Sequence, residues 1–176
     1  MAEYLKKAFS SGGLILFTAL TKQSTDSIKD LAESLNMPYV TERWLGGTLT
    51  NFKVISARIK KLEEMENEQK SGRLDKYTKK ERLLFDKDLK KMEGRFGGLR
   101  KLVKLPDILF VSSLKESTLP IREARIMKIP VVAIANTDSD PDDVKYIIPA
   151  NDRSKKSIDI IIEALKNELI NGSQTK

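Results

Sequence analysis

The chain contains no cysteine and no histidine among its 176 residues. The absence of cysteine excludes disulfide bonds and thiol nucleophiles, and the absence of histidine excludes imidazole acid–base catalysis. The two side chains that most often hold zinc or haem are therefore missing as well. Its serines lack the histidine partner of a catalytic triad and stand in no G-x-S-x-G motif. The sequence does not exclude a catalytic pair of carboxylates, but nothing places such a pair at a cleft with a cofactor motif. We therefore expect no enzyme, no cofactor and no metal.

Long hydrophobic runs and phosphate-loop glycines are absent too. The longest early apolar run, residues 14–20, is interrupted by Thr18 and is far too short to cross a bilayer. Residues 1–9 lack the order of a secretory signal, in which charge precedes a long apolar stretch. Neither G-x-G-x-x-G nor a Walker glycine–lysine pattern occurs, which argues against a dinucleotide site. We expect a protein of the cytoplasm or of an organelle matrix.

Charge is abundant and unevenly placed. The chain has 32 Lys and Arg against 25 Asp and Glu, a formal net charge of +7. Residues 51–104 hold 17 of the basic and 9 of the acidic residues, whereas the rest of the chain holds 15 and 16. The whole basic excess thus belongs to the middle third of the sequence. A near-neutral body with one basic segment is suited to local docking onto phosphates.

Outside that third, short apolar runs alternate with amphipathic helical patterns. We expect strands at residues 14–17, 38–40, 108–111, 131–135 and 146–148. We expect helices at residues 3–9, from Ser24 to about residue 35, at 119–127 and after Ser154. Strands that alternate with helices predict an α/β fold, with a parallel sheet covered by helices on both faces.

The middle third has a different pattern. Apolar residues recur there at heptad spacing, first at Phe52, Ile55, Ile59 and Leu62, then at Phe85, Leu89, Met92, Phe96, Leu99 and Val103. This spacing predicts two helices packed along a narrow seam. A polar break at residues 70–78 separates the helices, and Thr78 with Glu81 forms a capping-box pattern. Because the connection is short, we expect the helices to be antiparallel. We therefore divide the chain into an α/β domain, residues 1–50 and 105–176, and an inserted coiled-coil hairpin, residues 51–104.

The segment before the hairpin, residues 43–51, holds the only tryptophan and two adjacent glycines. An arginine can pair with phosphate, a tryptophan can stack on a base, and glycines let the backbone approach a partner. In the alternative interpretation Trp44 is buried and the glycines form a turn into a helix that Thr48 or Thr50 caps. The two interpretations are compatible. The RNA-facing candidates here are Arg43, Trp44, Gly46, Gly47, Thr48, Thr50 and Asn51.

Basic side chains supply the other candidates. Lys22 follows the first strand, at the sheet edge where α/β folds place ligands. The second hairpin helix is more basic than the first, so we expect it to face phosphate, although such charges are often only a solvated face. Its candidates are Lys79, Lys80, Lys87, Lys90, Lys91 and Arg95. The first helix carries acidic residues between Glu63 and Glu68, which we expect to face solvent or a basic protein neighbour.

Four aspartates gather near a proline, at Asp138, Asp140, Asp142 and Asp143. Such a cluster can hold a divalent cation, but the glycine and terminal glutamate of a calcium loop are absent. Aspartates beside proline are typical of turns and helix caps, which is the interpretation that we prefer.

Several motifs of this chain occur in the order found in one known family. They are Met37–Val40, Arg43–Phe52, Thr78–Glu81, Gly97–Leu99, Leu105–Asp107, Glu123-Ala124, Ile129–Ile134, Asp140-Pro141 and Ile148-Pro149. On these residues the chain resembles, over nearly its whole length, the small-subunit ribosomal protein S-two family of bacterial or organellar type. Members usually have further N-terminal residues with an early strand, so we expect one sheet edge to be uncovered here. Ser113, Lys128 and Ala150 depart from the usual residues, which should alter local loops.

The resemblance implies a flavodoxin-like fold with an inserted coiled-coil hairpin. It also implies a structural role in the small ribosomal subunit, in contact with small-subunit ribosomal RNA near the junction of head and body. The implied partners are neighbouring ribosomal proteins, including the mRNA-binding protein S-one. It assigns the RNA-facing or loop-shaping positions to Lys22 and to the candidates of residues 43–51.

Two other functions are weighed against this one. A nucleotide-dependent α/β enzyme would need the phosphate-loop motif that the chain lacks. A coiled-coil adaptor that binds proteins would differ from an RNA-binding protein in its response to salt, because RNA binding weakens steeply as salt rises.

Overall fold

The computed structural model describes residues 2–71, 77–140, 142 and 144–173. Its centre is a parallel sheet of five strands in the order β2-β1-β3-β4-β5. The strands are β1 (Ile15–Thr18), β2 (Tyr39–Val40), β3 (Ile108–Val111), β4 (Val131–Ala135) and β5 (Tyr146–Pro149). Every neighbouring pair is parallel, with Phe17 opposite Phe110 in the centre. The α/β class and the parallel sheet predicted from the alternation are therefore confirmed.

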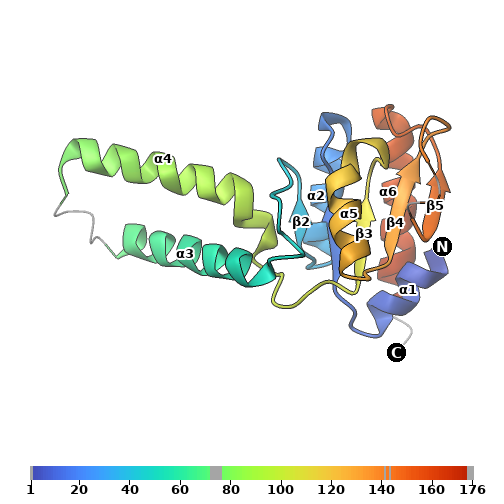
Figure 1. Cartoon of the computed structure of the whole chain (residues 1–176), viewed down its shortest axis with the longest axis horizontal. Helices are drawn as coiled ribbons and strands as arrows, with labels where there is room; N and C mark the ends of the chain where they lie inside the picture. The colour runs from blue at the N-terminus through green and yellow to red at the C-terminus, as the bar shows by residue number, and fades with distance from the viewer. Residues whose placement is uncertain (1, 72–76, 141, 143, 174–176) are drawn as a thin grey trace.

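Helices cover both faces of the sheet (Figure 1). Helices α1 (Ala2–Ser10), α2 (Lys22–Ser34) and α6 (Lys155–Ser173) pack against one face. Helix α5 (Thr118–Ile126), together with the roots of α3 and α4, packs against the other. The three central strands are buried on both faces, which is why they read as continuous apolar runs and not as alternating ones. Within the described residues, every helix is too short or too polar to span a membrane.

Helices α3 (Phe52–Lys70) and α4 (Lys79–Phe96) lie side by side, run in opposite directions and extend away from the sheet (Figure 1). We call this pair the arm. Ile55, Ile59 and Leu62 of α3 and Leu89 of α4 are buried between them. The capping box predicted at the start of α4 is present, with Thr78 and Glu81 bonded reciprocally. Residues 72–76, which include part of the predicted break, lie outside the described residues.

The predicted heptad pattern fails beyond Phe96. There α4 ends and a 3-10 turn, η2 (Gly97–Leu99), begins. Leu99 stays buried, but Val103 is 82% exposed and Leu102 is buried instead. In this turn the backbone lies close to the edge strand, because a Cβ on Gly98 would lie 2.4 Å from the carbonyl oxygen of Tyr39. The absence of a side chain on Gly98 therefore lets the root of α4 lie against the edge strand β2.

The start of α2 also differs from the prediction. The helix begins at Lys22, and Ser24, the expected first polar residue, is fully buried in its first turn. Its hydroxyl lies 2.8 Å from the hydroxyl of Ser112, which follows β3. A buried hydrogen-bonded serine pair therefore joins α2 to the carboxyl end of the sheet.

Candidate nucleic-acid interface

A buried glutamate organises the loop from which the arm emerges. Glu123 belongs to α5 and is 4% exposed. Its Oε1 accepts hydrogen bonds from the indole Nε1 of Trp44 at 3.0 Å and from the amide of Gly47 at 2.8 Å. Its Oε2 accepts from the amides of Leu49 at 2.9 Å and Thr50 at 3.2 Å, and from the Thr50 hydroxyl at 3.3 Å. One carboxylate thus holds five donors from residues 44–50.

These donors keep the buried carboxylate charged. Burial alone is the largest influence and raises the pKa of Glu123. The hydrogen bonds from Trp44, Leu49, Gly47 and Thr50 together outweigh burial and hold that pKa below its ordinary value. A buried charge without such partners would be strongly destabilising, so the loop and the glutamate require each other.

The glycine pair has a local role. Gly47 has a φ of +91°, a conformation that residues with a Cβ rarely adopt, and this turn presents its amide to Glu123. Thr48 is buried, and its hydroxyl donates to the carbonyl of Leu45 at 2.6 Å. Asn51 precedes α3 and is exposed, and its amide donates to the carbonyl of Gly47 at 2.8 Å. The turn is therefore closed by its own backbone before the helix begins.

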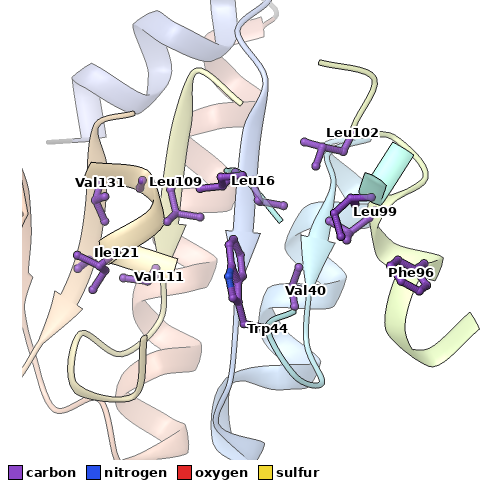
Figure 2. Packing of buried hydrophobic residues seen from close by; sticks show 14 of the residues in the cluster. Leu16, Val40, Trp44, Phe96, Leu99, Leu102, Leu109, Val111, Ile121 and Val131 are labelled. Carbon is purple, nitrogen blue, oxygen red and sulfur yellow. The ribbon is translucent and has the colours of Figure 1, made fainter. Parts of the chain in front are cut away.

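Trp44 lies inside the protein. It is 4% exposed and belongs to the core cluster on the α5 side of the sheet. Figure 2 shows its ring among the labelled side chains of Leu16, Val40 and Val111. Of the two interpretations offered for this residue, the structure contains the buried one, and the ring is not exposed for stacking on a base. Thr48 is likewise enclosed, whereas Arg43, Gly46, Thr50 and Asn51 are exposed.

The sequence alone does not predict that Glu123 is part of the candidate site. It appears in the sequence motifs only as part of a matched dipeptide, and glutamate is almost never fully buried unless it has partners. A weak signal existed, because Glu123 stands between Ile121 and Ala124, which are both buried on the inner side of α5. The partners come from residues 73 to 79 positions earlier in the chain, so no local pattern reveals them.

A cleft of about 610 Å³ lies at the root of the arm. It brings together Arg43, from the loop, and Arg95, near the end of α4. Three other basic residues and three acidic ones also line it: Lys29, Arg100, Lys101, Glu33, Glu42 and Glu93. Two of these acids have partners within the chain, because Glu33 accepts from the Tyr39 hydroxyl and Glu93 lies 3.9 Å from Arg100. The cleft therefore has a basic surplus.

The other predicted arm residues are exposed along α4. Lys80, Lys87 and Lys91 are seven and four positions apart, which places them on one side of the helix. That side lies opposite the apolar residues that face α3. Lys91 and Arg95 also border a groove of about 630 Å³ between the two helices. Its other charged lining residues are Arg58, Lys61, Glu68 and Asp88. Lys79 lies at the far end of the arm and Lys90 on its flank.

One prediction about neighbouring charges changes, and that is the prediction for the acidic residues of α3. Glu66 is not free for a protein neighbour, because it pairs with Arg100. Asp138 accepts hydrogen bonds from Lys115 at 3.0 Å and Arg153 at 2.6 Å, and Asp140 accepts from the amide of Asp142. Asp140 thus makes a turn contact, as expected, and Asp138 forms ion pairs with two other segments. Asp143 lies outside the described residues. Lys22 is exposed at the start of α2, apart from both clefts.

Comparison with known proteins gives one family. The family model described as Ribosomal protein S2 matches residues 1–172. The small ribosomal subunit protein uS2 of Flavobacterium johnsoniae is 44% identical over 170 residues, which are 97% of this chain and 67% of that protein. The protein of the same name from Fusobacterium nucleatum is 41% identical over 98% of this chain and 70% of its own length. That from Amoebophilus asiaticus is 45% identical over 97% of this chain and 54% of its own length.

Proposed function

This chain belongs to the ribosomal protein S2 family, and from that membership we infer that it is a structural constituent of the small ribosomal subunit. The family is one of structural ribosomal proteins and not of enzymes. The chain therefore acts by binding and positioning, within the small subunits of the cytoplasm. Its partners are small-subunit ribosomal RNA and neighbouring ribosomal proteins.

We propose that α3 and α4 form an antiparallel coiled coil, inserted at residues 51–104 into a flavodoxin-like α/β domain of residues 1–50 and 105–176. The buried residues of both helices and the capping box of α4 support this division. The strand order, with β1 between β2 and β3, supports the flavodoxin-like comparison.

The arm and its root are the proposed RNA-binding surface. The observation that carries this proposal is the row of outward lysines on α4 that leads through Arg95 to the cleft shared with Arg43. Phosphates of folded RNA recur along its backbone, and a row of cations on a straight helix can meet several of them. This proposed surface also includes Lys22, Lys79, Lys80 and the exposed residues of the loop.

Residues 44–50 support the proposed interface through contacts inside the protein. The five hydrogen bonds to Glu123 fix the turn, and the turn sets the direction in which α3 leaves the body. In this proposal Trp44, Gly47 and Thr48 shape the interface, while Arg43, Gly46, Thr50 and Asn51 are exposed to reach RNA. We also propose ribosomal protein S-one as a neighbour, which rests on the resemblance alone.

The test reverses three charges on the arm. The variant Lys87→Glu, Lys90→Glu, Lys91→Glu should assemble poorly into small subunits, measured by cosedimentation across a salt gradient. Each lost phosphate contact should reduce the slope of log K against log salt by about 0.7–0.9. The fold should survive, because all three side chains are exposed. Loss of S-one from subunits that carry this variant would place that neighbour on the arm.

The control changes the net charge equally on another face. Lys7, Lys156 and Lys166 belong to α1 and α6, on the opposite side of the sheet. Their replacement by glutamate should leave assembly close to normal. If the arm variant assembles as well as the unmodified chain, or if both variants fail to the same degree, the arm is not the RNA-binding element.

A further inference from the structure

The outer side of α5 and the loops at its ends carry basic residues that belong neither to the arm nor to its root. Five exposed cations come together there from four segments: Lys115, Arg122, Arg125, Lys128 and Lys145. We call them the body strip. Counting charges along the sequence does not reveal the body strip, because the residues outside 51–104 have a net charge close to zero.

Two adjoining clefts run along the body strip. The first has a volume of about 360 Å³ and is lined by Lys115, Arg122 and Arg125. The second has about 340 Å³ and is lined by Arg125, Lys128 and Lys145. Because Arg125 lines both, they form one continuous basic surface. The remaining lining of the second cleft is Ile129, Pro130 and Val131, so no carboxylate of the described residues lines it.

The first cleft has two acidic neighbours, Asp138 and Asp140. Asp138 is already neutralised within the chain by Lys115 and Arg153. The hydrogen bond from Lys115 is the main reason why the pKa of Asp138 lies below its ordinary value. Asp140 is engaged by the amide of Asp142. The lining of the first cleft thus holds three basic residues, Lys115, Arg122 and Arg125, against these two acidic ones, and Lys115 is paired with Asp138.

Lys128 occupies a position where a lysine is unfavourable for the fold. Its φ is +57°, in the left-handed region. It follows the end of α5, where the amide of Ile129 donates to Ala124 and the amide of Lys128 donates to Arg125. This is the helix-ending turn in which glycine is the preferred residue. A side chain kept at a strained backbone position suggests a function for that side chain.

Lys145 is held in place at the other side of the second cleft. Its ammonium nitrogen lies 5.4 Å from the ring centre of Tyr4 and 5.5 Å from that of Tyr146. The contact restricts the long side chain, so less conformational entropy is lost when it meets an anion.

We propose that the body strip is a second phosphate-binding surface for RNA, distinct from the arm. This proposal rests on the function proposed above. A row of cations that spans two clefts, with no unpaired carboxylate among the lining residues described for the second, suits a ribose–phosphate backbone. An acidic protein partner is the other class to consider, since Leu119 and Ile126 of α5 are 43% and 64% exposed beside the strip. The experiment separates the two.

The first variant is Lys128→Gly, tested with the whole chain and deproteinised small-subunit ribosomal RNA of Flavobacterium johnsoniae. Glycine removes the charge and also relieves the backbone strain. In 0.1 M salt the affinity should fall about five- to eightfold, which corresponds to one contact at a slope of roughly 0.7–0.9. The melting temperature should stay equal or rise. Lys128→Arg keeps the charge on the same strained backbone and should keep the affinity.

The second variant combines Lys128→Gly with Arg122→Gln and Lys145→Gln. For this variant, the slope of log K against log salt should be smaller in magnitude by about 2 to 3 than for the unmodified chain. The triple Lys7→Gln, Lys156→Gln, Lys166→Gln is the matched control and should change the slope little. An unchanged slope for the body-strip variant, with a reduced slope for the arm variant, overturns this proposal and leaves the arm intact. The reverse pattern overturns the arm proposal alone. If the body-strip variant binds RNA normally but a ribosomal protein neighbour is lost from small subunits, the strip is a protein-binding surface. That result also overturns the body-strip proposal.

Discussion

Glu123→Gln is the substitution that tests the loop at the arm's root most directly. Glutamine has the same shape as glutamate, but it offers one acceptor oxygen where the carboxylate offers two. Oε1 now receives two donors and Oε2 receives three. Whichever way the amide turns, its NH₂ group meets at least two N–H groups that had been accepted. Those groups are enclosed between α5 and the loop, where water cannot easily replace the acceptor.

The expected loss of stability is large for an isosteric change. Each buried donor left unpaired costs about 1–3 kcal/mol, and loss of the charge weakens the bonds that remain. The sum is about 3–5 kcal/mol, comparable to the cost of breaking a buried charge pair. A domain of this size has a total stability of roughly 5–15 kcal/mol, so the variant should fold with a clearly lower urea midpoint.

Urea unfolding at pH 7 measures this loss, and the only tryptophan reports on the same loop. If the loop opens locally, Trp44 emission should shift to the red while the far-ultraviolet circular dichroism stays unchanged. In a Trp44→Phe background one donor is already gone, so Glu123→Gln should cost about 1–2 kcal/mol less than in the unmodified chain. A change in unfolding free energy below about 0.5 kcal/mol, typical of a surface site, would refute the reasoning.

The same substitution has a definite pH dependence. The pKa of Glu123 in the fold lies below the ordinary value of 4.5. Its contribution to stability is therefore fully present above pH 4.5 and is lost as the pH falls through the lower folded pKa. Glutamine does not titrate. The stability difference between the chain and its Glu123→Gln variant should thus be constant near neutral pH and should shrink in acid.

Two pairs of glycine substitutions provide further predictions, both measured by urea unfolding. Gly47→Ala should cost about 1–2 kcal/mol because its φ is +91°, whereas Gly46→Ala should be nearly neutral because nothing lies within 4 Å of the new Cβ. Gly98→Ala should cost about 1–3 kcal/mol, since its Cβ would lie 2.4 Å from a backbone oxygen of Tyr39. Gly97→Ala, whose nearest neighbour would be 3.6 Å away, should be tolerated. Equal effects within either pair would contradict the geometry.

The sequence predicts the sheet well and the end of the arm poorly, for a physical reason. Strands β3 and β4 match residues 108–111 and 131–135 because complete burial leaves a continuous apolar run. The heptad pattern correctly predicts the faces of α3 and α4 up to Phe96. It shows which residues would share a face if the helix continued, but not where the helix stops. The turn after α4 lies against Tyr39 of β2, and a contact between such distant segments is not visible in local spacing.

The candidate site is only partly readable from the sequence for the same reason. The row of lysines on α4 follows from local spacing, and its exposure agrees with that pattern. Trp44 is a residue type that can stack on a base, but it is buried in this chain. The acceptor for its indole N–H is Glu123 of α5, 79 positions later, so local sequence does not reveal the burial. The body strip is also not predictable from the sequence, because its residues come from separate segments. Its cations are scattered among acidic residues in the chain and are collected only by folding.

Helix α5 connects these features. Successive helical residues differ by about 100°, so Glu123 points into the loop at the arm's root while its neighbour Arg122 lies in the body strip. One rigid helix therefore fixes the position of the arm relative to the strip. The two proposed phosphate-binding surfaces, held at a fixed separation, would bind as one bivalent unit, with an affinity above that of either surface alone. Loosening the loop at Glu123 should then weaken RNA binding although Glu123 itself touches no RNA, because the arm would no longer be held in register with the strip.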